Sequence, residues 1–458
     1  MQAKTKASEL YMKPMLAAVA AVVCAGVFAA DVKPTREPQR CRLETSDIVC
    51  EGQGGNIAPK TTEFNEHPTS ENLAARELFR KRAFGLFIHY GPYSVSGRGE
   101  WQKLLEAIPN DRYFAERLPD FKPKATCVDE WVKLAQDAGM TYIVLTTRHH
   151  DGHWLGDDFI REFATKVRAA GMGVGLYFSV TDWSDPGYCA GPRKDPEGWK
   201  RFVEKAHAKL RHMMADFGKI DYLFYDGCPP PEEWGLLKIN AEIRRLQPHL
   251  LICRGFLDCD FKSFEQCNGF GCPNLWESCY TFNGSWGYNK ADLDFKPLPG
   301  LLQNFAAIRQ NGGNLLLNVG PMADGTVQPE AVERLRTAGK WVKANRAALF
   351  NVIPNAFGYL PREVMVSDAS DPRIVYFLPS LNRTYDGRVV ACIKTPLKRL
   401  TYLDSGEEIA FTEDFSGATP RITIPKLRPL EPGEPPYFLK LEFDVKPEAV
   451  VNEHCPKY

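Results

Sequence analysis

The sequence predicts an α/β protein in which a (β/α)8-like barrel of the TIM type is followed by a small C-terminal antiparallel β-sandwich domain. Between residues 84 and 320, short apolar runs alternate with amphipathic helical stretches. These runs are apolar throughout, as expected for parallel strands that are buried on both faces. After about Ala348, short strands are separated by Gly, Pro, Asp and Ser instead. That change of pattern is typical of an antiparallel β domain.

Seven barrel strands are recognisable, and the fold implies an eighth that the pattern does not reveal. The expected strands are Phe84–Tyr90, Thr141–Thr147, Val174–Val180, Asp221–Gly227, Leu250–Arg254, Pro273–Ser278 and Asn314–Gly320. The helices expected between them include Thr126–Ala138, Phe159–Ala170, Gly198–Phe217, Glu232–Leu246 and Gly300–Gln310. No G-x-G-x-x-G follows the first strand and no Walker loop is present, so a barrel is favoured over an open dinucleotide-binding sheet.

The chain divides into four expected segments. Residues 1–30 are expected to be a signal peptide and residues 31–75 a polar leader or linker. The catalytic barrel is expected over residues 76–348 and the β domain over residues 349–458. The expected strands of the β domain lie in "RIVYFLP", "RVVACIK", "RLTYLD" and "PYFLKLEFD".

The N-terminal segment predicts export. Lys4, Lys6 and Lys13 precede the apolar run "MLAAVAAVVCAGVFAA", which is short for a membrane span and ends in small residues. A secreted or periplasmic protein is therefore expected, and no other stretch is long and apolar enough for a membrane helix. Without Cys24 twelve cysteines remain, an even number that permits disulfides in an exported chain.

Charge composition argues against some partners. Lys plus Arg and Asp plus Glu number 57 each, so no basic excess indicates a nucleic acid or an anionic membrane surface. The oligomeric state is not readable from the sequence.

Polar and aromatic side chains gather where the expected strands end. In a barrel of this kind the chemistry lies at the C-terminal ends of the strands. The residues at these ends, or on the loops that follow, are His89, Glu100, Trp101, Arg148, His149, His150, Asp151, Tyr177, Asp182, Trp183, Asp226, Arg254, Glu265, Glu277 and Trp286.

Asp226 ends an apolar strand, where a carboxylate is costly unless it is solvated or paired. With Gly227 it forms an Asp-Gly pair, so one interpretation is a turn residue. The other is a catalytic carboxylate that acts with a second one, Glu265 or Glu277, as in a glycosidase.

His149 and His150 are adjacent, so their side chains leave an extended strand in different directions. Three roles are open: a structural or surface role, a metal site completed by His89 and Asp151, and hydrogen bonding to sugar hydroxyls. No H-E-x-x-H or H-x-H pattern occurs, and Trp and Tyr are frequent in the loops. These observations favour sugar recognition.

Taken together, these residues make the chain resemble the α-L-fucosidases of glycoside hydrolase family 29. Matching stretches in the family's order are "FGLFIHYGPYS", "EWQ", "TTRHHDG", "GLYFSVTDW", "YLFYDG", "RGFLDCDFKSFEQ", "LWESCYTFNGSWGYN" and "GGNLLLNVGPMADGTV". They span Phe84 to Val327. The resemblance implies an exported, retaining exo-hydrolase that removes terminal α-L-fucose from fucosylated oligosaccharides or glycoproteins and requires no metal and no organic cofactor.

The resemblance also implies roles for individual residues. Asp226 matches the nucleophile, and Glu265 is preferred to Glu277 as the acid/base. The positions that match fucose contacts are His89, Glu100, Trp101, His149, His150, Tyr177, Arg254 and Trp286.

Three departures from the family keep other functions open. Tyr90 and Phe224 stand where the family usually has Trp, and the loop after "HHDG" is much shorter than usual. The pocket wall beyond His150 is therefore expected to be shorter. The alternatives are a fucose-binding protein of the same fold with weakened catalysis, a retaining glycosidase for a related sugar such as galactose, and a metal-dependent hydrolase.

Overall fold

The computed structural model describes residues 67–227, 231–254, 258–270, 272, 274–354, 363–379, 386–391, 393–417 and 420–449. The predicted signal peptide and residues 31–66 of the predicted leader lie outside these residues. Within them, no helix combines the length and the apolar character needed to span a membrane.

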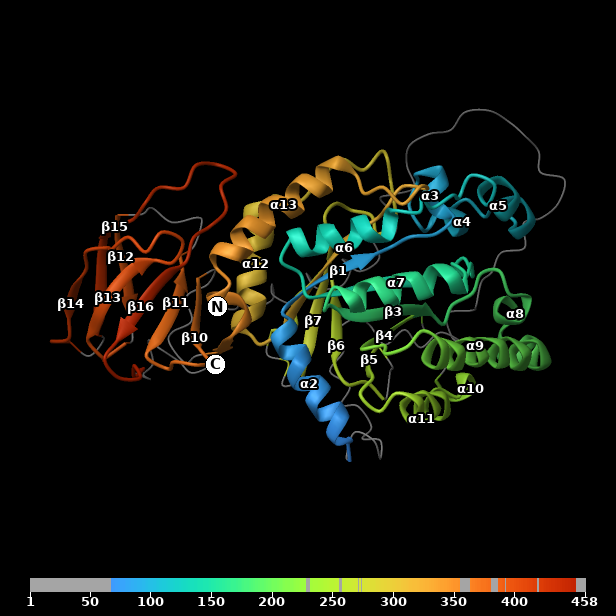
Figure 1. Cartoon of the computed structure of the whole chain (residues 1–458), viewed down its shortest axis with the longest axis horizontal. Coiled ribbons are helices and arrows are strands. Elements are labelled where there is room, and N and C mark those ends of the chain that lie inside the picture. Colours follow the sequence, from blue (N-terminus) through green and yellow to red (C-terminus); the bar gives the residue numbers. More distant parts are fainter. Residues whose placement is uncertain are drawn as a thin grey trace, which may run out of the picture. The chain divides into compact units, whose positions relative to one another are not determined.

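Eight parallel strands form the barrel sheet, in the order β5-β4-β3-β2-β1-β8-β7-β6 (Figure 1). The strands are β1 (Phe84–Ile88), β2 (Tyr142–Arg148), β3 (Gly173–Ser179), β4 (Tyr222–Asp226), β5 (Leu251–Cys253), β6 (Lys262–Glu265), β7 (Trp276–Thr281) and β8 (Asn314–Val319). The first strand pairs with the last. A parallel bridge between Cys253 and Phe261 links the two edges, so the sheet is a nearly closed barrel and the predicted fold class is confirmed.

The strand that the sequence pattern did not reveal is β6, Lys262–Glu265. It has four residues, all of them only partly buried, and Phe264 is its one large apolar side chain. An apolar run is therefore absent. The next strand, β7, begins at Trp276, three residues later than expected. It pairs in parallel with β6, and Glu265 lies opposite Cys279 in the register.

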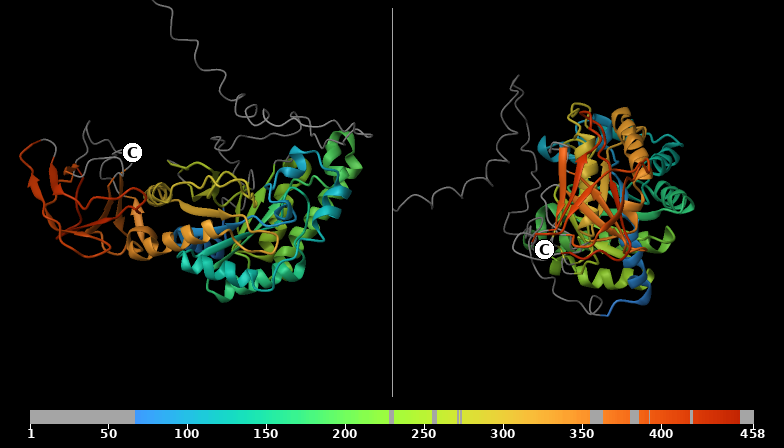
Figure 2. Two further views of the ribbon diagram at one scale, coloured as in Figure 1. Left: turned by 90° about the horizontal axis from the view of Figure 1, so that it is seen from above. Right: turned by 90° about the vertical axis from the view of Figure 1, so that its left-hand side faces the viewer.

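Helices lie outside the barrel strands (Figures 1 and 2). The described helices up to residue 350 are α2 (Ser70–Arg82), α3 (Tyr93–Ser96), α4 (Gln102–Leu105), α5 (Asn110–Arg117), α6 (Cys127–Asp137), α7 (Asp157–Ala169), α8 (Pro186–Lys194), α9 (Pro196–Asp216), α10 (Pro231–Trp234), α11 (Leu236–Leu246), α12 (Leu298–Gln310), α13 (Pro329–Ala344) and α14 (Ala347–Phe350). The helix expected over Glu232–Leu246 is divided at Gly235, whose φ of 68° interrupts the helical backbone.

The barrel is filled by a mainly aromatic interior. Phe79 of α2 reaches the strands from the N-terminal end, with its ring 4.4 Å from that of Phe261 and 5.3 Å from that of Tyr222. Outside the strands, α6 buries Val128, Trp131 and Ala135 on one face. This is the 3.6-residue periodicity that the sequence displays.

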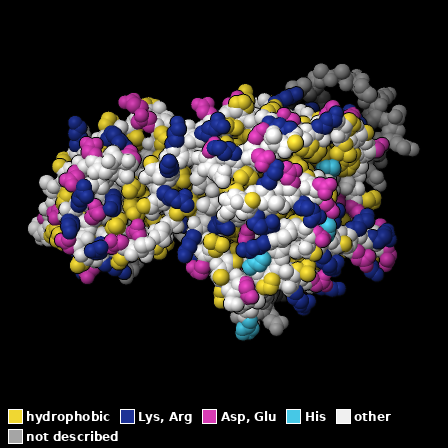
Figure 3. All heavy atoms as spheres, viewed as in Figure 1, with side chains coloured by type: hydrophobic (Ala, Val, Ile, Leu, Met, Phe, Trp, Pro, Cys, Tyr) yellow, Lys and Arg dark blue, Asp and Glu magenta, His cyan; other side chains and the backbone are white. Residues whose placement is uncertain are grey.

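The C-terminal region consists of two antiparallel sheets, of orders β13-β16-β11-β10-β9 and β12-β15-β14. Their strands are β9 (Val352–Pro354), β10 (Val364–Asp368), β11 (Ile374–Leu378), β12 (Asp386–Ala391), β13 (Leu397–Tyr402), β14 (Thr412–Asp414), β15 (Arg421–Lys426) and β16 (Leu439–Phe443). Val375, Phe377, Leu441 and Ile422 share one apolar core between the sheets. Acidic and basic side chains intermingle on the face shown in Figure 3.

Most of the described cysteines of the barrel are reduced. Cys127, Cys253, Cys259, Cys267, Cys272 and Cys279 carry free thiols. Cys189 is disulfide-bonded.

Candidate active site

The ten predicted site residues all lie at the C-terminal ends of the barrel strands or on the loops that follow them. His89 follows β1, His149 and His150 follow β2, Tyr177 lies on β3, Asp226 ends β4, Arg254 follows β5, Glu265 ends β6, Trp286 lies on the loop after β7, and Glu100 and Trp101 lie between β1 and α4. Parallel strands direct these ends to one side of the barrel.

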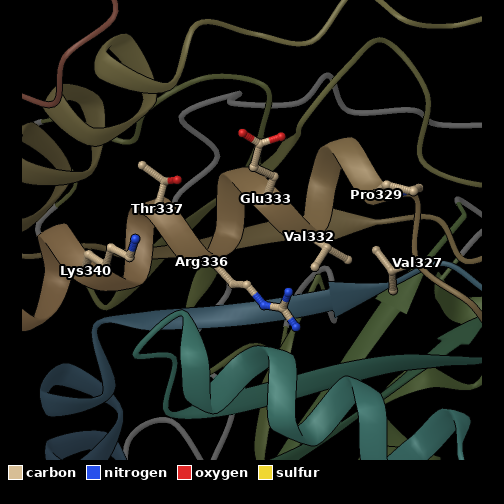
Figure 4. A pocket seen from close by; sticks show the side chains of 7 residues that line it. All are labelled: Val327, Pro329, Val332, Glu333, Arg336, Thr337 and Lys340. Carbon is tan, nitrogen blue, oxygen red and sulfur yellow. The ribbon is translucent and has the colours of Figure 1, made fainter.

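A surface pocket of about 570 Å³ lies along α13 (Figure 4), and none of the ten predicted site residues lines it. This pocket is therefore separate from the candidate active site.

Arg254 joins the two candidate catalytic carboxylates. Its Nη1 donates to Oδ1 of Asp226 and its Nη2 to Oε2 of Glu265, both at 3.0 Å. The side chains of Asp226 and Glu265 are 26% and 24% exposed, so both are accessible from the open end of the barrel. A glycosidase pair requires two accessible carboxyl groups near one another, and Asp226 and Glu265 are brought together through Arg254.

Asp226 is held as a carboxylate. The Tyr177 hydroxyl donates to its Oδ2 at 2.7 Å, and the N–H of Gly227 donates to its Oδ1 at 3.0 Å. Burial by itself raises the pKa of Asp226, but its interactions with His150 and with the Arg254 charge, together with these two hydrogen bonds, outweigh it and lower the pKa below its ordinary value. Asp226 is therefore ionised at neutral pH.

The hydrogen bonds of His150 define its tautomer. Ser179 donates its only hydroxyl proton to the carbonyl of Thr181 at 2.7 Å, so it accepts from Nδ1 of His150, also at 2.7 Å. Burial lowers the pKa of His150, which favours the neutral ring. Its Nε2 then carries a lone pair and lies 3.5 Å from Oδ2 of Asp226. Two acceptors at this distance leave a place for a donor such as a ligand hydroxyl.

His89 has the same kind of fixed tautomer. The Asn318 amide donates to the carbonyl of Trp286 at 2.7 Å, which leaves its Oδ1 to accept from Nδ1 of His89 at 2.6 Å. Burial lowers the pKa of His89 to about 3, so the ring is neutral and its Nε2 is an acceptor. No sequence pattern singles out Ser179 or Asn318, because each acts through a residue from another strand.

His149 and Tyr177 form the floor between these histidines. The two rings are stacked, with centroids 5.7 Å apart and an interplanar angle of 9°. The His149 ring also lies 4.2 Å from that of His150. Burial lowers the pKa of His149 well below its ordinary value, so it is neutral as well.

Aromatic side chains form the walls. The ring of Trp286 lies 5.1 Å from that of His89. Trp101 is 43% exposed, and its ring lies 5.4 Å from that of His150 and 5.2 Å from that of Trp183. Trp183, which the sequence places at a strand end without a role, therefore belongs to the same wall.

Glu100 connects two loops of the site. It is buried, and its Oε2 accepts from the N–H of Gly287 at 2.7 Å, next to Trp286. Burial raises the pKa of Glu100 to about 7. This carboxyl group therefore titrates near neutral pH while it supports the Trp286 loop.

The shortened loop after His150 folds back immediately. Trp154 forms a bridge with Arg148, the N–H of Leu155 donates to the carbonyl of Thr147 at 3.1 Å, and α7 follows at Asp157. The N–H of Trp183 donates to the carbonyl of His150 at 2.8 Å. Trp183 and Trp101 thus cover the side of His150.

Tyr90 and Phe224, which stand where the family usually has Trp, do not form the surface that faces the sugar. Tyr90 lies outside that surface and Phe224 lies beneath it. Tyr90 is buried, its hydroxyl donates to the carbonyl of Ala323, and its ring packs on Trp131 of α6. It faces the helices because it follows His89, and neighbouring strand residues point to opposite faces. Phe224 lies inside the barrel, with the Arg254 guanidinium 4.9 Å above its ring.

Three side chains of the site lie close enough together to be considered as metal ligands. One nitrogen each of His149 and His150 and one oxygen of Asp226 lie within 4.8 Å of one another. Asp226 is already bonded to Arg254 and Tyr177, and the positive charge of Arg254 opposes a cation there. Asp151, a further ligand in the metal hypothesis, instead accepts from the Tyr113 hydroxyl at 2.9 Å. The donor set thus fits sugar hydroxyls better than a metal.

Glu277, the other candidate acid, is enclosed in the barrel. It is 1% exposed and accepts hydrogen bonds from the Tyr142 hydroxyl at 2.9 Å and the Ser263 hydroxyl at 3.2 Å. Burial raises the pKa of Glu277 to about 7. Its position on β7 is two residues before Cys279, the partner of Glu265 in the register, so it lies deeper in the barrel than Glu265.

The buried carboxyl group predicts a pH-dependent stability. The pKa of Glu277 is raised from 4.5 to about 7 in the folded chain, so its stabilising contribution is complete below pH 4.5 and is lost as the pH rises through 7. Between pH 5 and 8, we expect the unfolding free energy of the wild type to fall by roughly 2–3 kcal/mol relative to that of Glu277→Gln. Glutamine has the shape of a protonated glutamate but does not titrate. Urea unfolding of both proteins at the two pH values measures the difference. A constant difference would contradict a protonated Glu277.

The comparisons with known proteins point to one family. The family model described as "Alpha-L-fucosidase" matches residues 56–347. A plasma α-L-fucosidase of Homo sapiens is 28% identical over 349 residues, which cover 64% of this chain and 73% of the human one. A tissue α-L-fucosidase of Rattus norvegicus is 26% identical over 456 residues, with coverages of 86% and 95%.

Solved structures show the same fold. α-L-Fucosidase isoenzyme 1 from Paenibacillus thiaminolyticus superposes with a TM-score of 0.73 at 27% identity, covering 82% of this chain and all of its own. A family 29 (GH29) α-L-fucosidase from Bacteroides thetaiotaomicron, described as a trapped covalent intermediate, gives 0.72 at 23% identity, with coverages of 85% and 100%. The matched segment exceeds half of the chain, and the chain therefore belongs to the α-L-fucosidase family, glycoside hydrolase family 29.

Proposed function

We propose that this enzyme is a retaining exo-α-L-fucosidase that removes terminal α-L-fucose by double displacement, with Asp226 as nucleophile and Glu265 as acid/base. The observation that carries the proposal is the pair of accessible carboxylates joined by Arg254. Fucosylated oligosaccharides or glycoproteins are the proposed substrates. The N-terminal segment, with a plasma enzyme among its relatives, supports an exported protein.

In the first step the Asp226 carboxylate attacks the anomeric carbon, and Glu265 protonates the oxygen of the leaving group. A fucosyl ester of Asp226 forms. In the second step Glu265 removes a proton from water, which attacks the anomeric carbon and releases fucose with its original configuration. The lowered pKa of Asp226 suits the nucleophile, and the relative described as a trapped covalent intermediate supports this course.

The remaining site residues recognise the sugar in this proposal. The neutral rings of His89 and His150 offer lone pairs at Nε2 to sugar hydroxyls. The exposed face of Trp101 and the ring of Trp286 cover the apolar side of the sugar, including its C5 methyl group. Arg254 keeps Asp226 ionised before the first step.

Hydrolysis of an aryl α-L-fucoside with and without a chelator tests the proposal. We expect turnover that the chelator leaves unchanged, because the nucleophile and the proton donor are side chains of the protein. The matching aryl β-galactoside is the control, and we expect no turnover of it. Loss of activity with the chelator would overturn the metal-free mechanism. Tight fucose binding without turnover would instead indicate a binding protein.

A further inference from the structure

The residue after the proposed acid/base has an unusual backbone. Gln266 follows Glu265 directly and has a φ of 53°, a left-handed conformation that costs a non-glycine residue about 1–2 kcal/mol. Neighbouring groups must hold this turn, because it is otherwise unfavourable. Its position means that those groups also determine where the end of β6 presents the carboxyl group of Glu265.

Two hydrogen bonds hold Gln266 on strand β7. Its backbone N–H donates to the carbonyl of Cys279 at 2.9 Å. Its side-chain Nε2 donates to Oγ1 of Thr281 at 2.7 Å. Thr281 is fully buried, so the second bond is protected from water.

Lys296 completes the attachment from the other side of Thr281. Its ammonium group donates to Oγ1 of Thr281 at 2.8 Å, to the carbonyl of Thr281 at 2.9 Å and to the carbonyl of Asn283. An ammonium group has three protons, and these three acceptors use all of them. The Thr281 hydroxyl donates to the carbonyl of Asn283 and accepts from Gln266 and Lys296, so its bonding capacity is also filled.

The same lysine anchors the loop that carries Trp286. Asn283 begins this loop, and its amide donates to the carbonyl of Asp292 at 3.0 Å while its Oδ1 accepts from the N–H of Ser285. The backbone N–H of Lys296 also donates to the carbonyl of Phe282 at 2.7 Å. One side chain therefore connects the turn after Glu265 with the aromatic wall.

We propose that Lys296 is a positioning residue which, through Thr281 and Gln266, fixes the acid/base Glu265 against the leaving group. The inference rests on the proposed role of Glu265. Lys296 has no contact with the substrate in this proposal. It acts on the geometry of proton donation, where a displacement of about 1 Å costs up to 100-fold in rate.

The test compares two substrates: a fucoside whose leaving group is an acidic nitrophenol, and a fucosyl disaccharide whose leaving group needs protonation. For Lys296→Met and Thr281→Val, we expect kcat/KM to fall about 10- to 100-fold for the disaccharide and less than about threefold for the nitrophenyl fucoside. Thr281→Ser keeps the hydroxyl and should remain within about threefold of the wild type on both. Lys398→Met is the control, since Lys398 pairs with Asp444 on the exposed surface of the β domain.

Equal losses on both substrates, or no loss on either, would overturn the inference. Glu265→Ala, measured in parallel, separates this failure from failure of the proposed function. If Glu265→Ala discriminates between the substrates and the Lys296 and Thr281 variants do not, only the positioning role is wrong. If Glu265→Ala does not discriminate, the acid is another residue and both fail. Should Lys296→Met not fold, the Thr281→Val and Thr281→Ser pair decides.

Discussion

Replacing Asp226 by alanine is expected to lower kcat for an aryl α-L-fucoside by about 10⁴- to 10⁶-fold, because the residual site has no group to form the covalent intermediate. The other partners of Asp226 remain after this change. Arg254, Tyr177 and His150 still surround the vacated position. The variant should therefore bind fucose while failing to turn over the fucoside.

Azide offers a direct check of the role of Asp226. A small anion fits the space left by the carboxylate, and the positive charge of Arg254 favours it there. We expect azide to restore part of the turnover of Asp226→Ala and to give β-L-fucosyl azide, with inverted configuration, which NMR identifies. The wild type with azide is the control, and it should release fucose. Near-wild-type turnover by Asp226→Ala, or an azide product of retained configuration, would show that another residue is the nucleophile.

The sequence was sufficient for the barrel because the strands that build its core are apolar runs. β2 and β3 are buried at every position, and such runs are recognisable. β6 was not recognisable, because only Phe264 among its four residues is a large apolar side chain. Its stability depends on pairing with β7, a tertiary contact that no local pattern reports.

The sequence predicted which site residues lie at strand ends, but not which of them hydrogen-bond to one another. Asp226 and Glu265 end strands β4 and β6, and the bridge through Arg254 depends on the nearly closed sheet. The tautomers of His89 and His150 depend on Asn318 and Ser179. These residues are distant in sequence, and only the fold brings each pair together.

Arg254 bonds to two carboxylates that have different tasks in the proposed mechanism. Its positive charge suits Asp226, which must stay ionised to attack. The same guanidinium donates to Glu265 at 3.0 Å, while in the proposed mechanism Glu265 gives a proton to the leaving group. One guanidinium therefore positions both the proposed nucleophile and the proposed acid.

Glu265→Ala is expected to lower kcat/KM by about 10²- to 10⁴-fold for fucosides with basic leaving groups, and by less than about tenfold for nitrophenyl fucosides. Acidic phenols leave without a proton, whereas sugar alcohols do not. A series of aryl fucosides of graded phenol pKa measures this, and the dependence of kcat/KM on that pKa should be steeper for Glu265→Ala than for the wild type.

Glu277→Gln is the matched control for this series. Glu277 is a carboxyl group of the same barrel, but it is enclosed and bonded to Tyr142 and Ser263. Its replacement should leave the slope of the series unchanged, even where it alters stability. A steeper slope in Glu277→Gln with an unchanged one in Glu265→Ala would assign the acid to Glu277. That result would require the barrel interior to open to the substrate, because a proton donor has to reach the glycosidic oxygen directly or through one water.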